Sequence, residues 1–584
     1  MGAYQPGSAL PGEPAAIGTP YLDDLALGLC KEMHGLKIGS HMCFVSVDLN
    51  PGWSKQMLGL PIRFELLLNE LNPRIDSPNR LRTEAVELDF RVEETPIGLE
   101  IAIINAVCVA DYYVLHGKSI RQIGILGHHV PSPGQWYNNP RMSDAQSKPL
   151  SLIDTRKQPE PELRPQLLAG ERYTSRNFME REWERLWTRT WQIGCLESEI
   201  PRSGDYVTHD LGRESLLFVR DDAGAVRGWY NICQHRGNRL VQEESGRAGA
   251  FVCRYHGWVW QKNGELSQAQ DAEDFGGGSP CGRLQLTPFP VASWGGFVWF
   301  NLDPEAPPLE TFLEPVAREI DTYQMDRMIR THWITLESDC NWKVVQDNFC
   351  ESYHIPTVHP ALKYFLDDHY GSTQFDLYPN GHTRMLMVGG RASERVGNEE
   401  MTLRSFEQEL AFWELNVEDF RGRSHEIREA LQARKRELGP KKGLDFSRYT
   451  DNQLTDHFHY TIFPNLAFSM KPDGCIFLRP SPHPSDPEKC LFDVWYFTLF
   501  PDGVDEYPAQ SMDDLVRRDD PVPHQRGKLG EIYLGGGLDE DASVFVTQQN
   551  GLRSRAWRGA TLAGQERRVH YSHQVIDEYL EGIR

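Results

Sequence analysis

The sequence predicts an α+β protein of several domains with an all-β module near its middle. The chain has 584 residues, which is too long for one hydrophobic core, so two to four domains are expected. Residues 205–300 are short strand-like runs separated by turn signals such as "DDAGA" and "KNGE". Residues 301–584 mix helical patterns with long strand-like runs, which predicts an α+β domain large enough to enclose a pocket.

Composition narrows the class of protein. Apolar residues make up 40% of the chain and charged residues 25%, which is typical of a globular protein and excludes a mainly disordered one. The net charge of −22, with no basic cluster, disfavours a nucleic-acid partner and favours solubility. There is no apolar run of membrane-spanning length and no signal-peptide pattern, so we expect a cytoplasmic protein with no membrane partner. Eleven cysteines in such a chain argue for metal ligands over disulfides.

Residues 1–127 predict a small α+β domain of unknown role. A helical pattern at 21–36 precedes strand-like runs, and no catalytic constellation is visible. The runs are 42–49, 84–94 and 99–116. A partner-docking role is one hypothesis for this domain. The polar, Pro-rich residues 128–165 predict a linker, within which "MSDAQSKPL" looks like the start of a separate protein.

The stretch "NICQHRGNRLVQEESGRAGAFVCRYHGW" contains two pairs of candidate metal ligands. The pairs are Cys233 with His235 and Cys253 with His256. A Cys2His2 set can hold one tetrahedral zinc, or a [2Fe–2S] cluster with both cysteines on one iron and both histidines on the other. Zinc ribbons usually repeat Cys-x-x-Cys knuckles, whereas each pair here is mixed. The sequence therefore favours the cluster, with a potential raised by its two neutral imidazoles.

The stretch "NWKVVQDNFCESYHIPTVHP" contains a second candidate site, formed by His354 and His359. A five-residue step on a straight helix would separate the two side chains. Pro356 removes a backbone N–H and is expected to distort the helix between them. Two nearby histidines are more often structural, but an electron-carrying cluster in the same chain favours a redox role. With one carboxylate they would form the facial triad of non-haem Fe(II) oxygenases.

These motifs resemble those of the Rieske non-haem iron oxygenases, the ring-hydroxylating family, over residues 166–584. "CQHRG" and "CRYHGW" match the Rieske signature, and "RTWQIGC", "SGDYVTHDLG", "NWKVVQDNFCESYH" and "QQNGLRSRAW" are further family-like phrases. The resemblance implies an N-terminal helical part of the catalytic domain at 166–204, a Rieske module at 205–300 and a helix-grip catalytic domain at 301–584. It also implies a Rieske [2Fe–2S] cluster, a mononuclear Fe(II) and O₂ as co-substrate.

The resemblance also implies roles for residues around the iron. The family's third ligand is an Asp some eight residues before a Gln-x-Gly element, which in "LDEDASVFVTQQNGL" points to Asp541, with Asp539 and Glu540 as neighbouring alternatives. Glu351 stands where most of the family has an Asp that links an iron-bound and a cluster-bound histidine across the subunit boundary. Glu351 is expected on the same helical face as His354. Asn348, in the same motif, is a second candidate catalytic residue.

The predicted activity is hydroxylation of an organic, aromatic substrate, with cleavage of C–N or C–O bonds, as in a demethylase or a quaternary-ammonium oxygenase, as the alternative. A non-catalytic electron carrier would leave His354 and His359 unexplained. Electrons are expected from NAD(P)H through a separate reductase or ferredoxin, because no Gly-x-Gly-x-x-Gly loop follows a strand. The resemblance implies a homotrimer, with or without a β subunit, in which the cluster of one subunit serves the iron of its neighbour.

One strand-like run, "HFHYTIFPNLAFSM", is expected to line the substrate pocket. Phe463 and Asn465 are candidates to face the pocket. His457 and His459 alternate with Phe458 and so share one face of a strand, either as groups that support the iron ligands or as a polar strand face.

Overall fold

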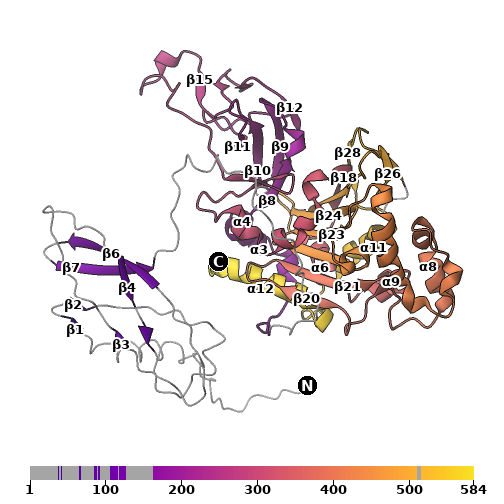
Figure 1. The fold of residues 1–584 in the computed structure, drawn as a ribbon. Helices are drawn as coiled ribbons and strands as arrows, with labels where there is room; N and C mark the ends of the chain where they lie inside the picture. Colours follow the sequence, from indigo (N-terminus) through magenta and orange to yellow (C-terminus); the bar gives the residue numbers. More distant parts are fainter. Residues whose placement is uncertain are drawn as a thin grey trace, which may run out of the picture. The chain divides into compact units, whose positions relative to one another are not determined.

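The computed structural model describes residues 162–509 and 514–584, together with seven strands among the first 125 residues (Figure 1). The chain divides into two compact units, Met1–Val130 and Pro131–Arg584. The helical pattern at 21–36 and most of the expected linker lie outside the described residues.

The first unit contains antiparallel strands, of which β4, β5 and β6 lie within the predicted runs 84–94 and 99–116, whereas β1, β3 and β7 lie outside all three runs. The order β4-β6-β7 forms one sheet, in which β6 pairs with β7 along its length. The strands are β1 (Lys37–Ile38), β2 (His41–Met42), β3 (Glu65–Leu66), β4 (Ala85–Leu88), β5 (Phe90–Arg91), β6 (Ala106–Leu115) and β7 (Lys118–Ile125).

The second unit begins with a short helical segment. Helix α2 (Glu171–Thr174) is followed by α3 (Arg176–Glu182), whose first turn is capped by the Ser175 side chain, and by a π-helical turn at Trp183–Trp187. Within the helical part expected at 166–204, the continuous helical segment therefore ends at Trp187. Gln192–Leu196 is strand β8, with all five residues buried, because it pairs with β17 inside the core.

Three small sheets make up the all-β module. One has the order β11-β10-β9-β12, the second β13-β14-β15 and the third β16-β17-β8. The strands are β9 (Asp205–Leu211), β10 (Glu214–Arg220), β11 (Val226–Tyr230), β12 (Ser245–Arg247), β13 (Phe251–Val252), β14 (Val259–Trp260), β15 (Leu266–Gln268), β16 (Val291–Trp294) and β17 (Phe297–Phe300).

A nine-stranded sheet is the centre of the following domain. Its order is β19-β21-β22-β23-β24-β25-β18-β28, with β20 also paired to β21, and its pairs are antiparallel except the parallel pair β18 and β28. The strands are β18 (Ile329–Ser338), β19 (Leu366–Asp367), β20 (Gln374–Leu377), β21 (Thr383–Gly389), β22 (His457–Ile462), β23 (Leu466–Lys471), β24 (Gly474–Pro482), β25 (Cys490–Thr498) and β28 (His524–Lys528). A separate hairpin joins β26 (Glu506–Pro508) to β27 (Leu515–Arg517).

Helices cover both faces of this sheet (Figure 1). On β22, Phe458, Tyr460 and Ile462 enter the core that includes residues of α8 and α9. The alternate residues of β22, His457 and His459 among them, therefore lie on the opposite face, as the period-2 pattern predicts. The helices are α4 (Leu309–Leu313), α5 (Val316–Ile320), α6 (Trp342–Phe349), α7 (Ile355–Val358), α8 (Glu399–Phe412), α9 (Ile427–Leu438), α10 (Asp451–Thr455), α11 (Gly536–Leu552) and α12 (Arg567–Glu581).

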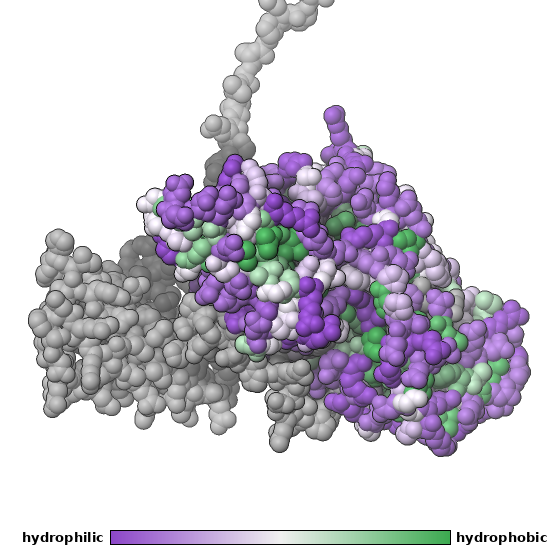
Figure 2. All heavy atoms as spheres, turned by 90° about the horizontal axis from the view of Figure 1, so that it is seen from above, coloured by the Kyte–Doolittle hydropathy of each residue, from purple (hydrophilic) through white to green (hydrophobic). Residues whose placement is uncertain are grey.

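The surface is mostly polar. Hydrophilic side chains cover most of the described part of the face seen in Figure 2, with smaller hydrophobic groups between them. Among the described residues, no helix has both the length and the apolar character required to cross a membrane.

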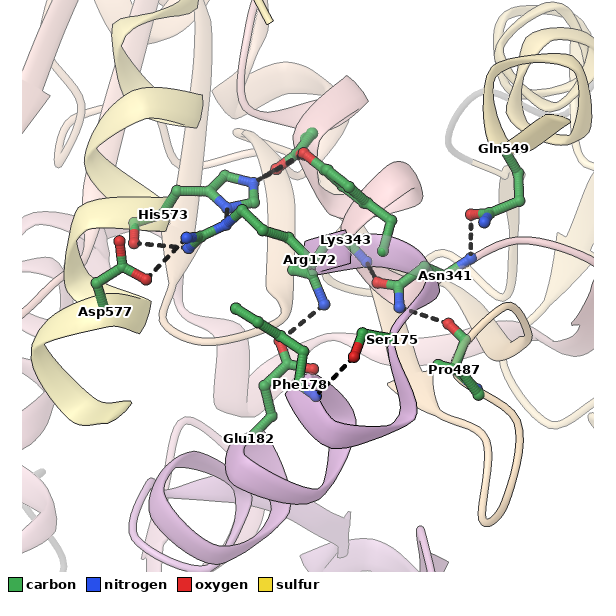
Figure 3. A network of polar contacts seen from close by, with 12 residues as sticks. Arg172, Ser175, Phe178, Glu182, Asn341, Lys343, Pro487, Gln549, His573 and Asp577 are labelled. Atoms are coloured by element: carbon green, nitrogen blue, oxygen red, sulfur yellow. Dashed lines mark hydrogen bonds and ion pairs between the residues drawn. The ribbon is translucent and has the colours of Figure 1, made fainter. Parts of the chain in front are cut away.

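Helix α6 is buried along its whole length and is held by polar contacts (Figure 3). The Lys343 ammonium lies 2.7 Å from a Glu182 carboxylate oxygen, and both side chains are almost fully buried. Burial raises the pKa of Glu182 and lowers that of Lys343. Each charge is therefore tolerated only because the other is present.

We expect Lys343→Met to lower the free energy of unfolding by about 3–5 kcal/mol, because it leaves the Glu182 charge buried and unpaired. Adding Glu182→Leu should restore most of the loss. Guanidinium denaturation followed by tryptophan fluorescence measures both. Lys441→Met, at an exposed lysine that also faces a glutamate, is the matched control. Equal effects of Lys343→Met and Lys441→Met would contradict the expectation.

Candidate metal centres

The first candidate centre is built on two loops of the same design. In each loop the cysteine carbonyl accepts a hydrogen bond from the glycine N–H four residues later, and the cysteine N–H donates to the carbonyl five residues later. The partners are Cys233 with Gly237 and Asn238, and Cys253 with Gly257 and Trp258. Both glycines have positive φ, +73° and +67°, so each loop turns through a conformation that favours glycine.

The structure brings the four predicted ligands together. The rings of His235 and His256 have centroids 4.6 Å apart, and His235 stacks on Trp258 at 4.5 Å. Both cysteines are buried. The indole N–H of Trp260 donates to the Cys233 sulfur at 3.4 Å, in keeping with a sulfur that carries negative charge.

The donor set fits a two-iron cluster. The Nδ1 atom of His235 is buried and has no hydrogen-bond partner among the described residues, which leaves it free to bind a metal. Burial and the nearby Cys253 raise the pKa of Cys233, so paired thiolates there need bound metal to stabilise them. No three of these four ligands have their metal-binding atoms within 4.8 Å of one another; among the described residues, a trio of other side chains does. Four ligands divided between two irons are expected to be spread in this way, unlike four around one zinc.

That trio is the second candidate centre: His354, His359 and Asp541. The Asp541 Oδ1 atom lies 3.3 Å from Nε2 of His354 and 2.8 Å from Nε2 of His359. The opposite nitrogen of each ring contacts a second carboxylate, Nδ1 of His354 at 2.5 Å from Glu351 and Nδ1 of His359 at 2.7 Å from Glu540. Both Nε2 atoms are thereby directed at one point beside Asp541.

The chain path between the two histidines differs from the expected distorted helix. Helix α6 ends at Phe349, and a separate one-turn helix, α7, has His354 at its N-cap and His359 at its C-cap. Pro356 occupies the first turn of α7, where its missing N–H costs no hydrogen bond. The proline thus begins a new helix instead of distorting an existing one.

Glu351 also reaches His354 by a different route from the expected helical face. It lies in the turn after α6, where its carboxylate accepts from the backbone N–H groups of Tyr353 and His354 and contacts the His354 ring. A local side-chain-to-backbone turn, and not helical periodicity, sets this contact.

The three adjacent acids before the Gln-x-Gly element have separate positions. Asp541 is buried against both histidines, the Glu540 carboxylate contacts His359, and Asp539 accepts from the backbone N–H of Leu534. Asn348 donates from Nδ2 to Asp541 at 2.9 Å and so orients its carboxylate. The contact of Glu540 with His359 was missed in the sequence, where only its position beside Asp541 pointed to the site.

Electrostatics at the trio favour a bound cation. Burial opposes protonation of His354, but its hydrogen bonds to Asp541 and Glu351 outweigh that effect and raise its pKa to about 10. Burial raises the pKa of Asp541, yet the two histidines lower it overall. Three carboxylates around two imidazoles therefore leave an excess of negative charge that a divalent metal would balance. Two histidines and one carboxylate are the donor set of non-haem Fe(II).

The other pocket candidates from the sequence lie elsewhere in the core. Phe463 stacks on Tyr579, and Asn465 donates to the Pro480 carbonyl. His459 Nδ1 lies 3.2 Å from a guanidinium nitrogen of Arg568. His459 thus contacts α12 through Arg568, and Phe463 contacts it through Tyr579. The Nε2 atom of His457, the remaining candidate, lies 3.2 Å from the Ser469 hydroxyl.

Comparison with known proteins assigns both parts of the second unit. Residues 190–287 match the family described as "Rieske [2Fe-2S] domain", and residues 325–582 match "Ring hydroxylating alpha subunit (catalytic domain)". The chain belongs to the Rieske non-haem iron oxygenases, as an α subunit, and the resemblance and fold class stated from the sequence are confirmed. The two matched domains imply a Rieske [2Fe–2S] cluster and a mononuclear iron as its cofactors.

Curated relatives act on different substrates. The carnitine monooxygenase oxygenase subunit of Escherichia coli K12 is 30% identical over 195 residues, 32% of this chain and 51% of that protein. Chloroplastic choline monooxygenase of Beta vulgaris is 32% identical over 33% and 45% of the two chains. The chlorobenzene dioxygenase α subunit of Cupriavidus sp. PS12 is 32% identical over 32% and 42%. The matches thus span about half or less of these relatives' lengths.

Solved structures agree on the fold. A quaternary ammonium Rieske monooxygenase bound to an inhibitor superposes with a TM-score of 0.51 at 19% identity, over 71% of this chain and 95% of that one. A naphthalene 1,2-dioxygenase bound to indole gives 0.50 at 20% identity, over 71% and 92%.

We expect Cys233→Ser or His256→Ala to abolish the red-brown absorbance of the purified protein, because each removes a ligand that the cluster requires. Visible absorption spectra and iron analysis measure the loss. Cys281→Ser, at a half-buried cysteine of the same module, is the control and should keep the colour. A colourless wild-type protein with stoichiometric zinc would contradict the cluster assignment.

We expect His354→Ala, His359→Ala and Asp541→Ala each to remove the mononuclear iron while the cluster spectrum persists, because the two donor sets share no residue. Metal analysis reports total iron, and the visible spectrum reports the cluster. Asp539→Ala is the control, since Asp539 contacts a backbone N–H of its own segment. Loss of iron in Asp539→Ala but not in Asp541→Ala would move the third ligand.

Proposed function

We propose that the chain is the oxygenase component of a multi-protein system that hydroxylates an organic substrate with O₂ and reducing equivalents from NAD(P)H. The observation that carries this proposal is the presence of both donor sets in one chain, a Cys2His2 pair of loops and a His2Asp trio. An electron carrier alone would not need the trio. Cys233, His235, Cys253 and His256 are proposed to bind the cluster.

The residues around the trio have distinct proposed roles. Mononuclear non-haem iron, when bound, activates O₂ with electrons that a Rieske cluster delivers. His354, His359 and Asp541 are proposed to hold that iron. Glu351 and Glu540 fix each ring so that Nε2 faces the metal, and Asn348 orients the Asp541 carboxylate.

Two substrate classes fit this site. An aromatic substrate agrees with the ring-hydroxylating catalytic domain, and the chlorobenzene dioxygenase is among the relatives. A quaternary ammonium substrate, oxidised next to nitrogen so that a C–N bond is cleaved, agrees with Glu351 in place of the common Asp and with the carnitine and choline monooxygenases. The polar residues His457, His459 and Thr461 on one face of β22 favour the second class.

We also propose the partners and assembly that the family resemblance implies. A separate reductase or ferredoxin is expected to supply electrons, and three copies are expected to form a homotrimer in the cytoplasm, with or without a β subunit. The residues near 205–300 and 301–584 are proposed to act as the cluster and catalytic domains, with 1–127 as a separate domain joined by the linker 128–165.

The activity is tested with the purified, metal-loaded chain and a reductase system. O₂ uptake and mass spectrometry of products are measured with aromatic and quaternary ammonium compounds. The proposal expects substrate-dependent O₂ consumption with one or two oxygen atoms incorporated from ¹⁸O₂. Release of formaldehyde or another carbonyl fragment would identify cleavage of a C–N bond. No substrate-stimulated uptake with any compound, in protein that holds both metals, would contradict the oxygenase assignment.

We predict that Glu351→Gln and Glu351→Ala retain both metals but lose at least 90% of product formation, because the carboxylate that links the iron-bound and the cluster-bound histidine is removed and electrons no longer reach the iron. Glu351→Asp should keep partial activity. In single turnovers with pre-reduced cluster, re-oxidation of the cluster should be slowed in parallel. Glu407→Gln, on the exposed side of α8, is the matched control. Normal cluster re-oxidation and product yield in Glu351→Ala would remove this role.

A further inference from the structure

Arg568, in the first turn of α12, is a buried cation that has no acidic partner in the part of the chain that the structure describes. Its side chain is fully buried. Its guanidinium donates from Nε to the Thr383 hydroxyl at 2.7 Å and contacts His459 Nδ1 at 3.2 Å. Its NH1 group is buried and makes no hydrogen bond to any residue that the structure describes.

Among the residues at 162–509 and 514–584, no carboxylate forms an ion pair with Arg568. Four acidic groups act on it through space: Cys350, Tyr378, Asp376 and Glu351. Burial raises the pKa values of the Cys350 thiol and the Tyr378 phenol, so both are neutral, and the two carboxylates are already engaged. Asp376 binds Arg384 at 2.8 Å, and Glu351 binds His354. Burial lowers the pKa of Arg568 to about 10, so the group is charged at neutral pH. An uncompensated buried charge is strongly unfavourable, and native proteins pair such charges or bind an anion there.

Arg568 lies on the same face of the sheet as the His2Asp trio. Thr383, its hydrogen-bond partner, shares a strand face with Met385, two residues later on β21. Met385 pairs in register with His459 and belongs to a small core that includes Ile355, the residue after His354. The segment that carries Arg568 also contacts the turn that carries Glu351 and His354, because the Gln565 side chain donates to the Ser352 hydroxyl.

The groups around the guanidinium are polar and uncharged. Thr383 and Thr461 face each other across β21 and β22, with their hydroxyl oxygens 2.6 Å apart. Burial and Arg568 itself hold the pKa of His459 well below its usual range, so this ring is neutral. With its Nδ1 accepting from Arg568, the ring carries its proton on Nε2. Among the described residues, the cation therefore has hydroxyl and imidazole hydrogen-bond partners but no negatively charged one.

We propose that Arg568 is a specificity residue that binds a carboxylate of the substrate, with NH1 as its unused donor. This inference rests on the proposed function, since it names the substrate class of that site. Arg568 then selects carboxylated compounds, either a betaine or an aromatic acid, over their neutral or purely cationic counterparts. A carboxylate supplies the charge and the hydrogen-bond acceptor that the protein leaves out.

The test compares compounds that differ only in the anionic group. The first pair is glycine betaine and choline, which share a trimethylammonium group, and the second is benzoate and benzyl alcohol. Dissociation constants are measured by calorimetry on the metal-loaded chain without reductase, so that binding is scored apart from turnover. In at least one pair the carboxylate should bind tenfold more tightly or better. The pair that shows the preference identifies the betaine or the aromatic acid as the source.

Variants separate a specificity role from a structural one. Arg568→Gln should weaken carboxylate binding at least tenfold, leave alcohol binding within about twofold and leave the cluster spectrum and iron content unchanged. Arg568→Lys should retain part of the preference. Arg567→Gln, one residue earlier on the same helix, makes the same change in net charge and should keep the preference. The ligand-free Arg568→Gln protein should melt at the same or a higher temperature than wild type, because a buried unpaired charge is removed.

Failure of this inference is distinguishable from failure of the proposed function. Equal binding of both members of each pair by wild type, or an unchanged preference in Arg568→Gln, would overturn the carboxylate role whether or not the protein oxygenates. A large fall in melting temperature in Arg568→Gln would show that the guanidinium is structural. Wild type alone decides the preference if that variant does not fold. Tight carboxylate binding without substrate-stimulated O₂ uptake would instead leave the inference intact and overturn the oxygenase assignment.

Discussion

The geometry of the His2Asp trio depends on the placement of helix α6. All eight of its residues are buried, and its polar side chains anchor it to separate parts of the chain. Lys343 binds Glu182 near the start of the domain (Figure 3). Asp347 accepts from Tyr173 and lies 3.0 Å from His573 of α12, and Asn348 donates to Asp541 of α11. These contacts add little net stability, because desolvation offsets them, but they allow one placement of the helix. The turn that carries Glu351 and His354 starts from that placement.

The two carboxylates behind the histidines are not equivalent. The Glu351 side chain is 12% exposed and also accepts from two backbone N–H groups, whereas the Glu540 side chain is 47% exposed. Because solvent screens an exposed carboxylate, Glu351 has the stronger hold on the orientation and basicity of its ring. This asymmetry gives His354 the more rigid connection to the rest of the site. Glu540 can yield to solvent or to another group without a rearrangement of the backbone.

Sequence reasoning reached the metal ligands because their spacing is local. The two loops at Cys233 and Cys253 and the step from His354 to His359 can be seen in short stretches, and Asp541 followed from the family pattern. The ends of the helices and strands that connect these ligands could not be predicted in the same way. The separate helix at Ile355–Val358 depends on where α6 stops, and the strand at Gln192–Leu196 depends on its distant partner β17. For Gln192–Leu196, pairing with β17 formed a strand inside residues 166–204, which the sequence predicted to be helical.

Arg568 shows most clearly what a sequence alone hides. In "QERRVHYSHQ" it is one of two adjacent arginines with nothing to mark it. Only the fold buries it against His459 and Thr383, on the strand faces opposite Phe458 and Tyr460. The period of two thus divides each strand between an apolar core and a polar surface near the metal ligands. A register slip of one residue would exchange these faces, so the pairing that forms the core also places the charge.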